Sequence, residues 1–436
     1  MKVVKVGLLG LGTVGGGTVN VLERNFSEIS RRSGCELVVS RASARDISRA
    51  RICNTDNIQL TTDSNEVVND PDIQIIVELM GGEEPAKSLI LSALAQGKHV
   101  VTANKALIAL HGNELFAAAA ENNVILAYEA AIAGGIPIVK AIREGLSANR
   151  IEWLAGIING TGNFILTEMR DKGSAFSDVL QQAQELGYAE ADPTFDVEGI
   201  DAAHKLCILA SLSFGMPLNF ARVYTEGISK ITPLDVTYAE ELGYRIKHLG
   251  VARRTEDGVE MRVHPTLIPE KRLIANVDGV MNAVLVKGNA VGATMYYGPG
   301  AGADATASAV VADLVDICRQ LDGSAASAVP ALGFASDKLE TLAILPIEQV
   351  KTAFYLRLSV QDKAGVMAAM TTILANNGIS IEAVLQKEPK QQGADAQVIL
   401  LTDCVLESDL ILALEQIESL DSTNGAVTRI RVESLQ

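Results

Sequence analysis

The sequence predicts an α/β protein in which a doubly wound parallel sheet is followed by an α+β segment and a small C-terminal α/β domain. Residues 3–9 form a nearly continuous apolar run, which is typical of a strand buried in a parallel sheet. Strand-like and helix-like segments then alternate up to about residue 130. Residues 351–436 read as strand, helix, strand, strand, helix and strand, the order of a ferredoxin-like βαββαβ domain.

The first segment supplies the elements of the parallel sheet. We expect further strands at 35–44, 73–79, 99–102 and 124–129, with helices at 14–25, 85–96 and 112–122. After Pro137 the pattern changes. We expect strands at 151–158, 260–268 and 281–288, and helices at 163–172, 201–214 and 305–321.

These elements suggest domain boundaries. A dinucleotide-binding domain would span 1–130 and be completed by a returning segment at about 300–325. A catalytic and dimerisation domain would span 131–322. A linker rich in glycine, serine and proline would cover 323–350, and the C-terminal domain 351–436.

Charge and cysteine content narrow the class of protein. The net charge of −16 disfavours binding to nucleic acid or to anionic membranes. The five cysteines are widely spaced and form no CxxC pair, which argues against a disulfide framework and a zinc site. No apolar run approaches the ~20 residues of a membrane helix. We therefore expect a cytoplasmic protein.

A glycine-rich turn follows the first strand. Gly10-Leu11-Gly12-Thr13-Val14-Gly15 matches G-x-G-x-x-G and leads into a helix. The first glycine permits the tight turn, the second permits close approach of a pyrophosphate, and the third lets the helix pack on the strand. The free N–H groups at the helix start favour the anion. This context predicts a Rossmann-type site for NAD or NADP.

The end of the second strand bears on the choice of cofactor. It reads Ala44-Arg45-Asp46. Arg45 would accommodate the 2′-phosphate of NADP, whereas Asp46 would hold the ribose 2′-hydroxyl of NAD. Because the arginine comes first, we favour NADP and keep NAD as the alternative.

Two lysines are candidates for the chemistry. Lys105 follows Thr102-Ala-Asn just beyond a parallel strand, where ligands of open α/β sheets bind. Lys205 begins an apolar helix after an acidic stretch at 187–201 and shares a helix face with Asp201. A surface ion pair is one interpretation. The other is a carboxylate-lined pocket for an amino group, with Lys205 as a proton donor to a carbonyl.

With these motifs the sequence resembles homoserine dehydrogenase. The resemblance covers residues 1 to about 330 and rests on motifs in the same order: GLGTVG at 10–15, ELMGG at 78–82, TANK at 102–105, YEAAIAGGIP at 128–137, NGTGN at 159–163 and the acidic stretch ending in Lys205. It implies the reversible, NAD(P)H-dependent reduction of L-aspartate 4-semialdehyde to L-homoserine, in the biosynthesis of threonine, methionine and isoleucine.

The resemblance also implies residue roles. Lys205 would protonate the substrate oxygen, and Lys105 would act beside the nicotinamide and the substrate. The substrate would be bound by Glu190, Asp196, Asp201 and Thr161, and the cofactor also by Thr102 and by Gly302 of the returning segment. A sodium ion would be held by Glu129, Ile132, Gly134 and Ile136, mostly through main-chain oxygens.

The C-terminal domain resembles an ACT domain. The loop that contains Asp362, Gly365 and Val366 fits the effector-binding loop of that family. The resemblance implies binding of an amino acid, with L-threonine the expected effector, and pairing of chains into a homodimer or homotetramer. A purely dimerising module is the alternative.

Two other functions compete with this one. A thioester-forming aldehyde dehydrogenase would need a cysteine nucleophile, for which Cys207 is the nearest candidate. A catalytically inactive, amino-acid-sensing regulatory protein would keep only the C-terminal function. The presence of Lys105, Glu190 and Lys205 argues against it.

Overall fold

The computed structural model describes residues 1–321, 328–387 and 395–436, and these divide into two compact units. The first unit contains Met1–Gly160, Asp201–Val223 and Val280–Leu342, and the second contains Thr161–Ile200, Tyr224–Gly279 and Ala343–Gln436. Each unit has its own hydrophobic core. Of the expected linker, positions 323–327 lie outside the described residues.

The first unit contains the predicted parallel sheet. Its strand order is β3-β2-β1-β4-β5-β6, and every neighbouring pair is parallel. The strands are β1 (Lys2–Leu9), β2 (Cys35–Ser43), β3 (Gln59–Thr61), β4 (Ile75–Glu78), β5 (His99–Thr102) and β6 (Leu126–Ala127). The chain reverses its direction of progress between β1 and β4, and such a switch point opens a crevice for a ligand at the carboxyl ends of the strands.

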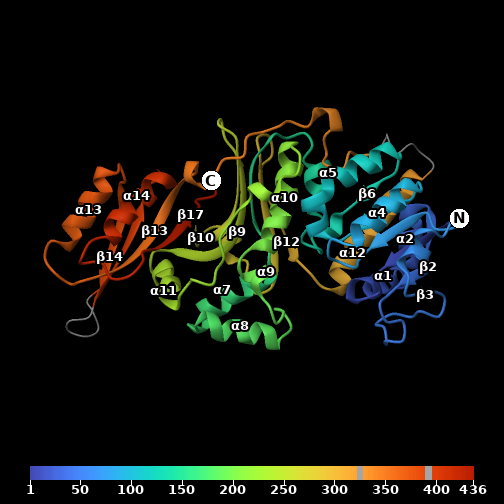
Figure 1. The fold of residues 1–436 in the computed structure, drawn as a ribbon, viewed down its shortest axis with the longest axis horizontal. Helices are drawn as coiled ribbons and strands as arrows, with labels where there is room; N and C mark the ends of the chain where they lie inside the picture. Colours follow the sequence, from blue (N-terminus) through green and yellow to red (C-terminus); the bar gives the residue numbers. More distant parts are fainter. Residues whose placement is uncertain (322–327, 388–394) are drawn as a thin grey trace. The chain divides into compact units, whose positions relative to one another are not determined.

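Helices cover both faces of this sheet (Figure 1). One layer contains α1 (Thr13–Arg24), α2 (Phe26–Ser33) and α12 (Ala303–Gln320), which contact one another. The other contains α3 (Ser64–Val68), α4 (Ala86–Ala95) and α5 (Lys105–Glu121). The returning helix α12 therefore packs in the same layer as α1 and α2.

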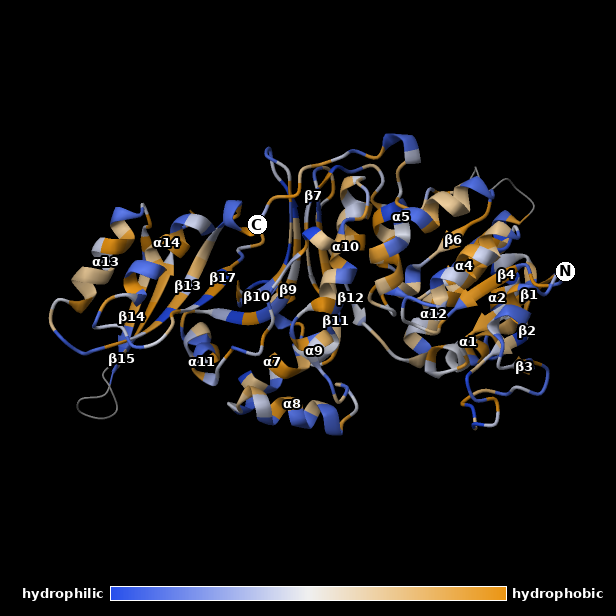
Figure 2. Ribbon diagram, in the orientation of Figure 1, coloured by the Kyte–Doolittle hydropathy of each residue, from blue (hydrophilic) through white to orange (hydrophobic). Residues whose placement is uncertain are grey.

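The sheet is buried because its strands are apolar on both sides. Ile75, Ile76 and Val77 of β4 have no exposed surface, and hydrophobic colour follows these strands in Figure 2. The core joins β1, β2 and β4 to α12 through Ala307, Val310 and Leu314. No helix in the described parts of the chain is long and apolar enough to cross a membrane.

The rest of the first unit follows β6. A short turn at Glu129–Ala131 leads to α6 (Ile138–Lys140) and a π-helical turn (Ala141–Gly145). Strand β11 (Met281–Gly288) pairs antiparallel with β7 (Ile151–Ile157) and with β12 (Gly292–Pro299). Helix α10 (Ile200–Phe214) is buried along almost its whole length.

The second unit is built on a mixed sheet with the order β9-β10-β17-β13-β15-β14. Its strands are β8 (Tyr224–Thr225), β9 (Tyr244–Arg254), β10 (Val259–Pro269), β13 (Lys351–Val360), β14 (Ile381–Lys387), β15 (Ala396–Thr402), β16 (Val405–Leu406) and β17 (Thr428–Val432). Its helices are α7 (Gly160–Lys172), α8 (Phe176–Glu185), α9 (Thr194–Val197), α11 (Pro233–Glu241), α13 (Val366–Asn376) and α14 (Glu407–Glu418).

The C-terminal segment has the predicted βαββαβ order, and its last strand also joins the preceding segment. Strand β17 pairs antiparallel with β13 and parallel with β10, where Thr266 lies opposite Arg431. One core cluster contains Phe164, Ile246, Tyr355 and Ile430. Residues from both halves of the second unit are therefore packed together.

Some expectations about single elements are wrong. Helix α5 begins at Lys105 instead of residue 112, because the Asn104 side chain accepts a hydrogen bond from Leu107 N and caps the helix. The strand expected at 124–129 shrinks to Leu126–Ala127. Strand β9 is not predicted from the sequence, because its basic residues obscure the apolar pattern.

Candidate active site

The glycine-rich turn connects β1 to α1 with the geometry that the motif predicts. Gly10 has a positive φ of 99°, and a Cβ atom there would lie 2.8 Å from Leu79 O. A Cβ at Gly15 would lie 2.3 Å from Gly10 O. At Gly12, which precedes the first residue of α1, a Cβ would meet nothing within 4 Å. Two glycines thus serve the fold, and Gly12 keeps open space above the helix start.

A cavity of about 1080 Å³ opens beside this turn. Gly10, Leu11 and Gly12 line it together with the segment that follows β2. Arg45, Arg49 and Arg51 all contribute to the lining. The volume is close to the upper end of the ~300–1,000 Å³ usual for small-molecule sites.

Arg51 and Asp46, which both line the cavity, make different hydrogen bonds. Arg51 donates a hydrogen bond to Leu11 O at 2.7 Å and so braces the glycine turn. Asp46 accepts hydrogen bonds from Ser48 N and Oγ, which hold the pKa of its carboxyl below the usual range. Arg49 and Arg51 are not among the cofactor residues expected from the sequence, although the run Arg-Ala-Arg at 49–51 indicates a basic loop.

Hydrogen bonds tie the loops after β4 and β5 together. The buried Glu78 carboxylate accepts from Met80 N, Gly81 N and Thr102 Oγ1 at 2.7–3.1 Å. Asn104 donates to Gly82 O at 2.6 Å. The ELMGG and TANK motifs, which are far apart in sequence, thereby fix the direction in which α5 starts.

The first residue of α5, Lys105, meets α10 at a shared carboxylate. Lys105 Nζ lies 2.8 Å from Asp201 Oδ1, and Lys205 Nζ lies 2.7 Å from Asp201 Oδ2. Lys205 also donates to Ile158 O at 2.7 Å, and Asn159 Nδ2 donates to Asp201 Oδ2 at 2.9 Å. Asp201 and Lys205 are paired, as their spacing suggests, but the pair is buried instead of lying on the surface, and the structure adds Lys105 to it.

The electrostatics of this cluster follow from burial. Burial alone would raise the pKa of the Asp201 carboxyl, but the charges of Lys205 and Lys105 outweigh it and hold that pKa well below the usual range. Asp201 therefore stays anionic between two cations. The side chain of Lys105 keeps 35% of its exposure and that of Lys205 keeps 11%, so the cluster is largely buried and solvent reaches it mainly at Lys105.

Two neighbouring groups on α10, His204 and Cys207, are buried. His204 stacks on Phe220 with ring centroids 4.2 Å apart, and burial lowers its pKa to about 4. Burial raises the pKa of the Cys207 thiol to about 12, because the charged thiolate is disfavoured in the core. Cys207 has no exposed surface, which rules out the thioester alternative at this residue.

The other expected substrate residues belong to the second unit. Glu190 is exposed, and Asp196 is half-buried on α9. Thr161 lies in the first turn of α7, where its hydroxyl donates to Tyr188 O at 2.7 Å. Thr161 and the acidic segment are therefore connected within the second unit.

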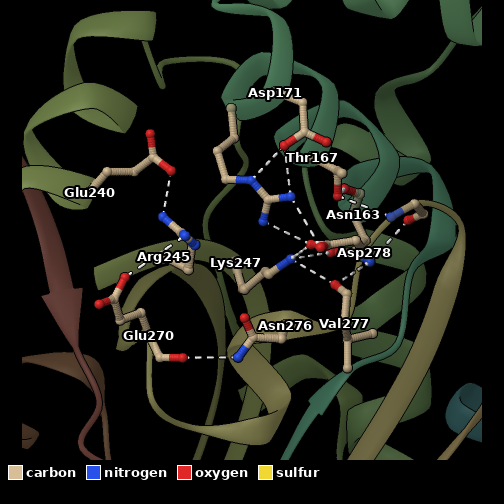
Figure 3. Close-up of polar contacts among 12 residues, drawn as sticks. Asn163, Thr167, Asp171, Glu240, Arg245, Lys247, Glu270, Asn276, Val277 and Asp278 are labelled. Atoms are coloured by element: carbon tan, nitrogen blue, oxygen red, sulfur yellow. Dashed lines mark hydrogen bonds and ion pairs between the residues drawn. The ribbon is translucent and has the colours of Figure 1, made fainter. Parts of the chain in front are cut away.

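A buried polar network anchors the NGTGN motif (Figure 3). Asn163 Nδ2 donates to Val277 O and Gly279 O. Lys247 of β9, with only 1% of its surface exposed, donates to Asn163 Oδ1, Val277 O and Asp278 Oδ1. Desolvation lowers the pKa of Lys247. This network, which the sequence did not reveal, fixes the first turns of α7.

The segment expected to hold sodium forms a buried turn in the first unit. Both oxygens of the Glu129 carboxylate accept main-chain hydrogen bonds, from Val139 N and Lys140 N at 2.9 Å each. Burial, and then Asp313, raises the pKa of Glu129 to about 7. A Cβ at Gly134 would lie 2.7 Å from Thr306 Oγ1, so the turn packs closely on the start of α12. Among the described residues, no cluster of three His, Cys, Asp or Glu side chains offers a metal site.

A doubly wound sheet with this glycine turn is typical of proteins that bind NAD or NADP. Comparison with known proteins then identifies the family. A model described as homoserine dehydrogenase, NAD binding domain, matches residues 10–129, and one described as homoserine dehydrogenase matches residues 137–315. An ACT domain model matches residues 354–422.

The chain is similar to known proteins along its whole length. A homoserine dehydrogenase from Pseudomonas aeruginosa is 60% identical over 435 residues, which cover 100% of both chains. The crystal structure of a homoserine dehydrogenase from Thiobacillus denitrificans is 61% identical, with a TM-score of 0.96, and the match covers 100% of this chain and 99% of that one. A hyperthermophilic archaeal homoserine dehydrogenase in complex with NADPH is 27% identical, with a TM-score of 0.62, covering 72% of this chain and 97% of that one. The chain belongs to the homoserine dehydrogenase family.

Proposed function

We propose that Lys205 is the general acid that protonates the substrate oxygen while L-aspartate 4-semialdehyde is reduced to L-homoserine. The observation that carries this proposal is the position of Lys205 Nζ, 2.7 Å from the buried anion Asp201. When bound, the nicotinamide would supply the hydride to the aldehyde carbon. Lys205 gives one proton to the carbonyl oxygen, so the product is the alcohol.

The other residues bind and orient the reactants. Lys105 forms an ion pair with the same carboxylate, that of Asp201, and positions the substrate or the cofactor. Asp201 keeps both ammonium groups in place. Glu190 and Asp196 bind the substrate ammonium, and Thr161 contacts the substrate. The turn at Gly10–Gly15 receives the pyrophosphate, and Thr102 and Gly302 complete the cofactor site.

For the cofactor we propose a preference for NADP over NAD. Arg45 is exposed at the end of β2 and lines the cavity beside the glycine turn. The carboxylate of Asp46, the residue that would favour NAD, already accepts a hydrogen bond from Ser48 Oγ. The NADPH complex of the archaeal relative agrees with this assignment.

The turn at Glu129 is our candidate for a sodium site. Its ligands would be Glu129 and the main-chain oxygens of Ile132, Gly134 and Ile136. A buried carboxylate whose pKa is raised to about 7 would gain from a neighbouring cation, and hard cations prefer oxygen ligands.

The ACT domain supports control by an amino acid, for which we propose L-threonine. Gly365, with a φ of 93°, precedes α13, and the exposed Asp362 lies in the same loop. Val366 is the first residue of α13 and is buried. Strand β14 is an edge strand of its sheet and offers a surface for pairing in a homodimer or homotetramer. We place the enzyme in the cytoplasm.

Steady-state oxidation of NADPH and of NADH with L-aspartate 4-semialdehyde, with and without L-threonine, tests these proposals together. We expect turnover with both cofactors, a higher kcat/KM for NADPH, and suppression by L-threonine. Turnover that is indifferent to L-threonine would contradict the effector assignment alone. No turnover by folded protein would contradict the catalytic roles and favour a purely regulatory protein.

A further inference from the structure

Lys247 of β9 is a buried lysine that the proposed mechanism does not use. Its exposed fraction is 1%. Its ammonium group donates to Val277 O at 2.7 Å, to Asp278 Oδ1 at 2.9 Å and to Asn163 Oδ1 at 3.3 Å, so each of its three protons has an acceptor. Apolar residues in place of a buried ion pair are often no less stabilising. The presence of a charge here therefore indicates a requirement other than stability.

Helix α7 is attached to β9 through Lys247 and the loop at 277–279. Three side chains on one face of α7, four and three positions apart, bond this loop (Figure 3). Lys247 bonds the same loop from β9, so the loop is held between a strand and a helix. The side chains on α7 are Asn163, which donates to Val277 O and Gly279 O, Thr167, which accepts from Gly279 N, and Arg170, which donates to both carboxylate oxygens of Asp278.

The first turn of α7 also carries Thr161, which is assigned above to the substrate. Thr161 lies two residues before Asn163, and its hydroxyl donates to Tyr188 O at 2.7 Å. The ring of Phe164 meets that of Tyr188 edge-on, with centroids 5.1 Å apart. Glu190, assigned to the substrate ammonium, follows Tyr188 by two residues. A displacement of this turn would therefore reach both substrate residues.

From these contacts we propose that Lys247 is a positioning residue for the substrate. It holds Asn163 and the loop at 277–279, and so fixes the first turn of α7 together with Thr161 and the segment that contains Glu190. Because Lys247 is buried, it acts through these residues and not by contact with a reactant. A misplacement of about 1 Å caused far from the chemistry can cost roughly 10²-fold in rate. The inference rests on the substrate-binding roles proposed for Thr161 and Glu190.

Steady-state kinetics of Lys247→Met in the full chain is the first test. The KM for L-aspartate 4-semialdehyde should rise about tenfold or more, because misplaced binding groups hold the substrate less well. The KM for NADPH should stay within about twofold, since the glycine turn belongs to the first unit. Partial unfolding gives a different result. It lowers the concentration of active enzyme, and with it the apparent kcat, but leaves both KM values unchanged.

Arg245→Met is the matched control. Arg245 lies two residues earlier on β9 and therefore on the same face of the strand. It carries the same charge but pairs with Glu240 and Glu270, as Figure 3 shows. Its substitution should leave the KM for the semialdehyde unchanged. An equal rise of this KM in Arg245→Met would overturn the inference, because any loss of charge on β9 would then suffice.

Asn163→Ala provides a second variant, which leaves the Lys247–Asp278 ion pair in place and carries the same test if Lys247→Met does not fold. It should raise the KM for the semialdehyde to a similar extent. The double variant should be no worse than either single variant, because both substitutions remove the same anchor. Fully additive effects would contradict a shared path.

Amide hydrogen exchange of the substrate-free chain separates this inference from the proposed function. Lys247→Met, compared with Arg245→Met, should exchange faster in peptides that cover 160–169 and 187–190. A normal KM for the semialdehyde in folded Lys247→Met, or unchanged exchange in these peptides, would overturn the positioning role. Absence of turnover by the unmodified chain would instead contradict the proposed function, and the exchange comparison would still decide whether Lys247 holds this turn.

Discussion

Lys205 and Asp201 form a buried ion pair one helical turn apart, with Nζ 2.7 Å from Oδ2. On the surface such a pair would contribute little to stability. Here it lies in an apolar helix, where a lysine is costly unless paired or functional. The same carboxylate holds Lys105, a residue 96 positions earlier in the chain. This convergence is the reason for assigning the chemistry to these residues.

Lys205→Ala should reduce kcat by about 10²–10⁴-fold, the usual contribution of a positioned general acid. The variant should remain folded and bind NADPH, because the glycine turn is untouched. Steady-state kinetics and cofactor titration measure this, with Lys338→Ala, a change at an exposed lysine, as the control. Near-normal kcat in folded Lys205→Ala would refute the role.

Arg45→Ala should lower kcat/KM for NADPH more than kcat/KM for NADH. Loss of one charge-assisted hydrogen bond costs about 1.5–3 kcal/mol, which is roughly ten- to hundredfold in kcat/KM. Because NADH lacks the 2′-phosphate, its kcat/KM should stay within about twofold. Arg31→Ala, on the exposed face of α2, serves as the control. An equal effect on both cofactors would contradict the assignment of Arg45.

Substitutions at two glycines of the turn should have different effects on the stability of the fold and on cofactor binding. Gly12→Ala adds a methyl group in open space at a negative φ, so its melting temperature should hardly change. Its affinity for NADPH should nevertheless fall, since the methyl group would occupy the approach of the pyrophosphate. In contrast, Gly15→Ala meets main chain at 2.3 Å and should destabilise the fold itself. Thermal melts and cofactor titrations of both variants distinguish these outcomes.

His204 should make stability depend on pH. Burial lowers its pKa to about 4 from an unfolded value of about 6.5. The unfolded chain therefore binds more protons between pH 6.5 and 4, so stability falls as the pH is lowered through this window. A shift of this size corresponds to about 3 kcal/mol.

Denaturant unfolding at several pH values tests this. His204→Asn should flatten the dependence between pH 6.5 and 4, whereas His111→Asn, a change at a more exposed histidine, should keep it. An unchanged slope in His204→Asn would show that other groups cause the acid sensitivity.

The sodium proposal predicts that NaCl raises the melting temperature above that in choline chloride of the same ionic strength. Glu129→Gln should abolish this difference, because it removes the only charged ligand of the proposed set. Glu121→Gln, at the exposed end of α5, should preserve it. Equal melting temperatures of the unmodified protein in both salts would contradict a sodium site.

Local patterns predicted much of the fold. The strand at 99–102, the strand at 281–288 and the βαββαβ order of the C-terminal segment follow from apolar runs and turn residues. Strand β9 did not, because Lys247 is made tolerable in the interior only by Asp278, Val277 and Asn163. Partners that lie 30 or more positions away leave no local signal.

The glycine turn, the shared helix face of Asp201 and Lys205, and the resemblance to the family could be recognised from the sequence, because they depend on short spacings and local backbone requirements. The structure was needed to show that Lys105 shares the Asp201 carboxylate, that Arg51 braces the glycine turn through Leu11 O, and that β17 of the C-terminal segment pairs with β10. Each of these contacts joins segments that are distant in the chain. They arise when burial of apolar surface brings those segments together, and the polar groups enclosed with them must then find partners.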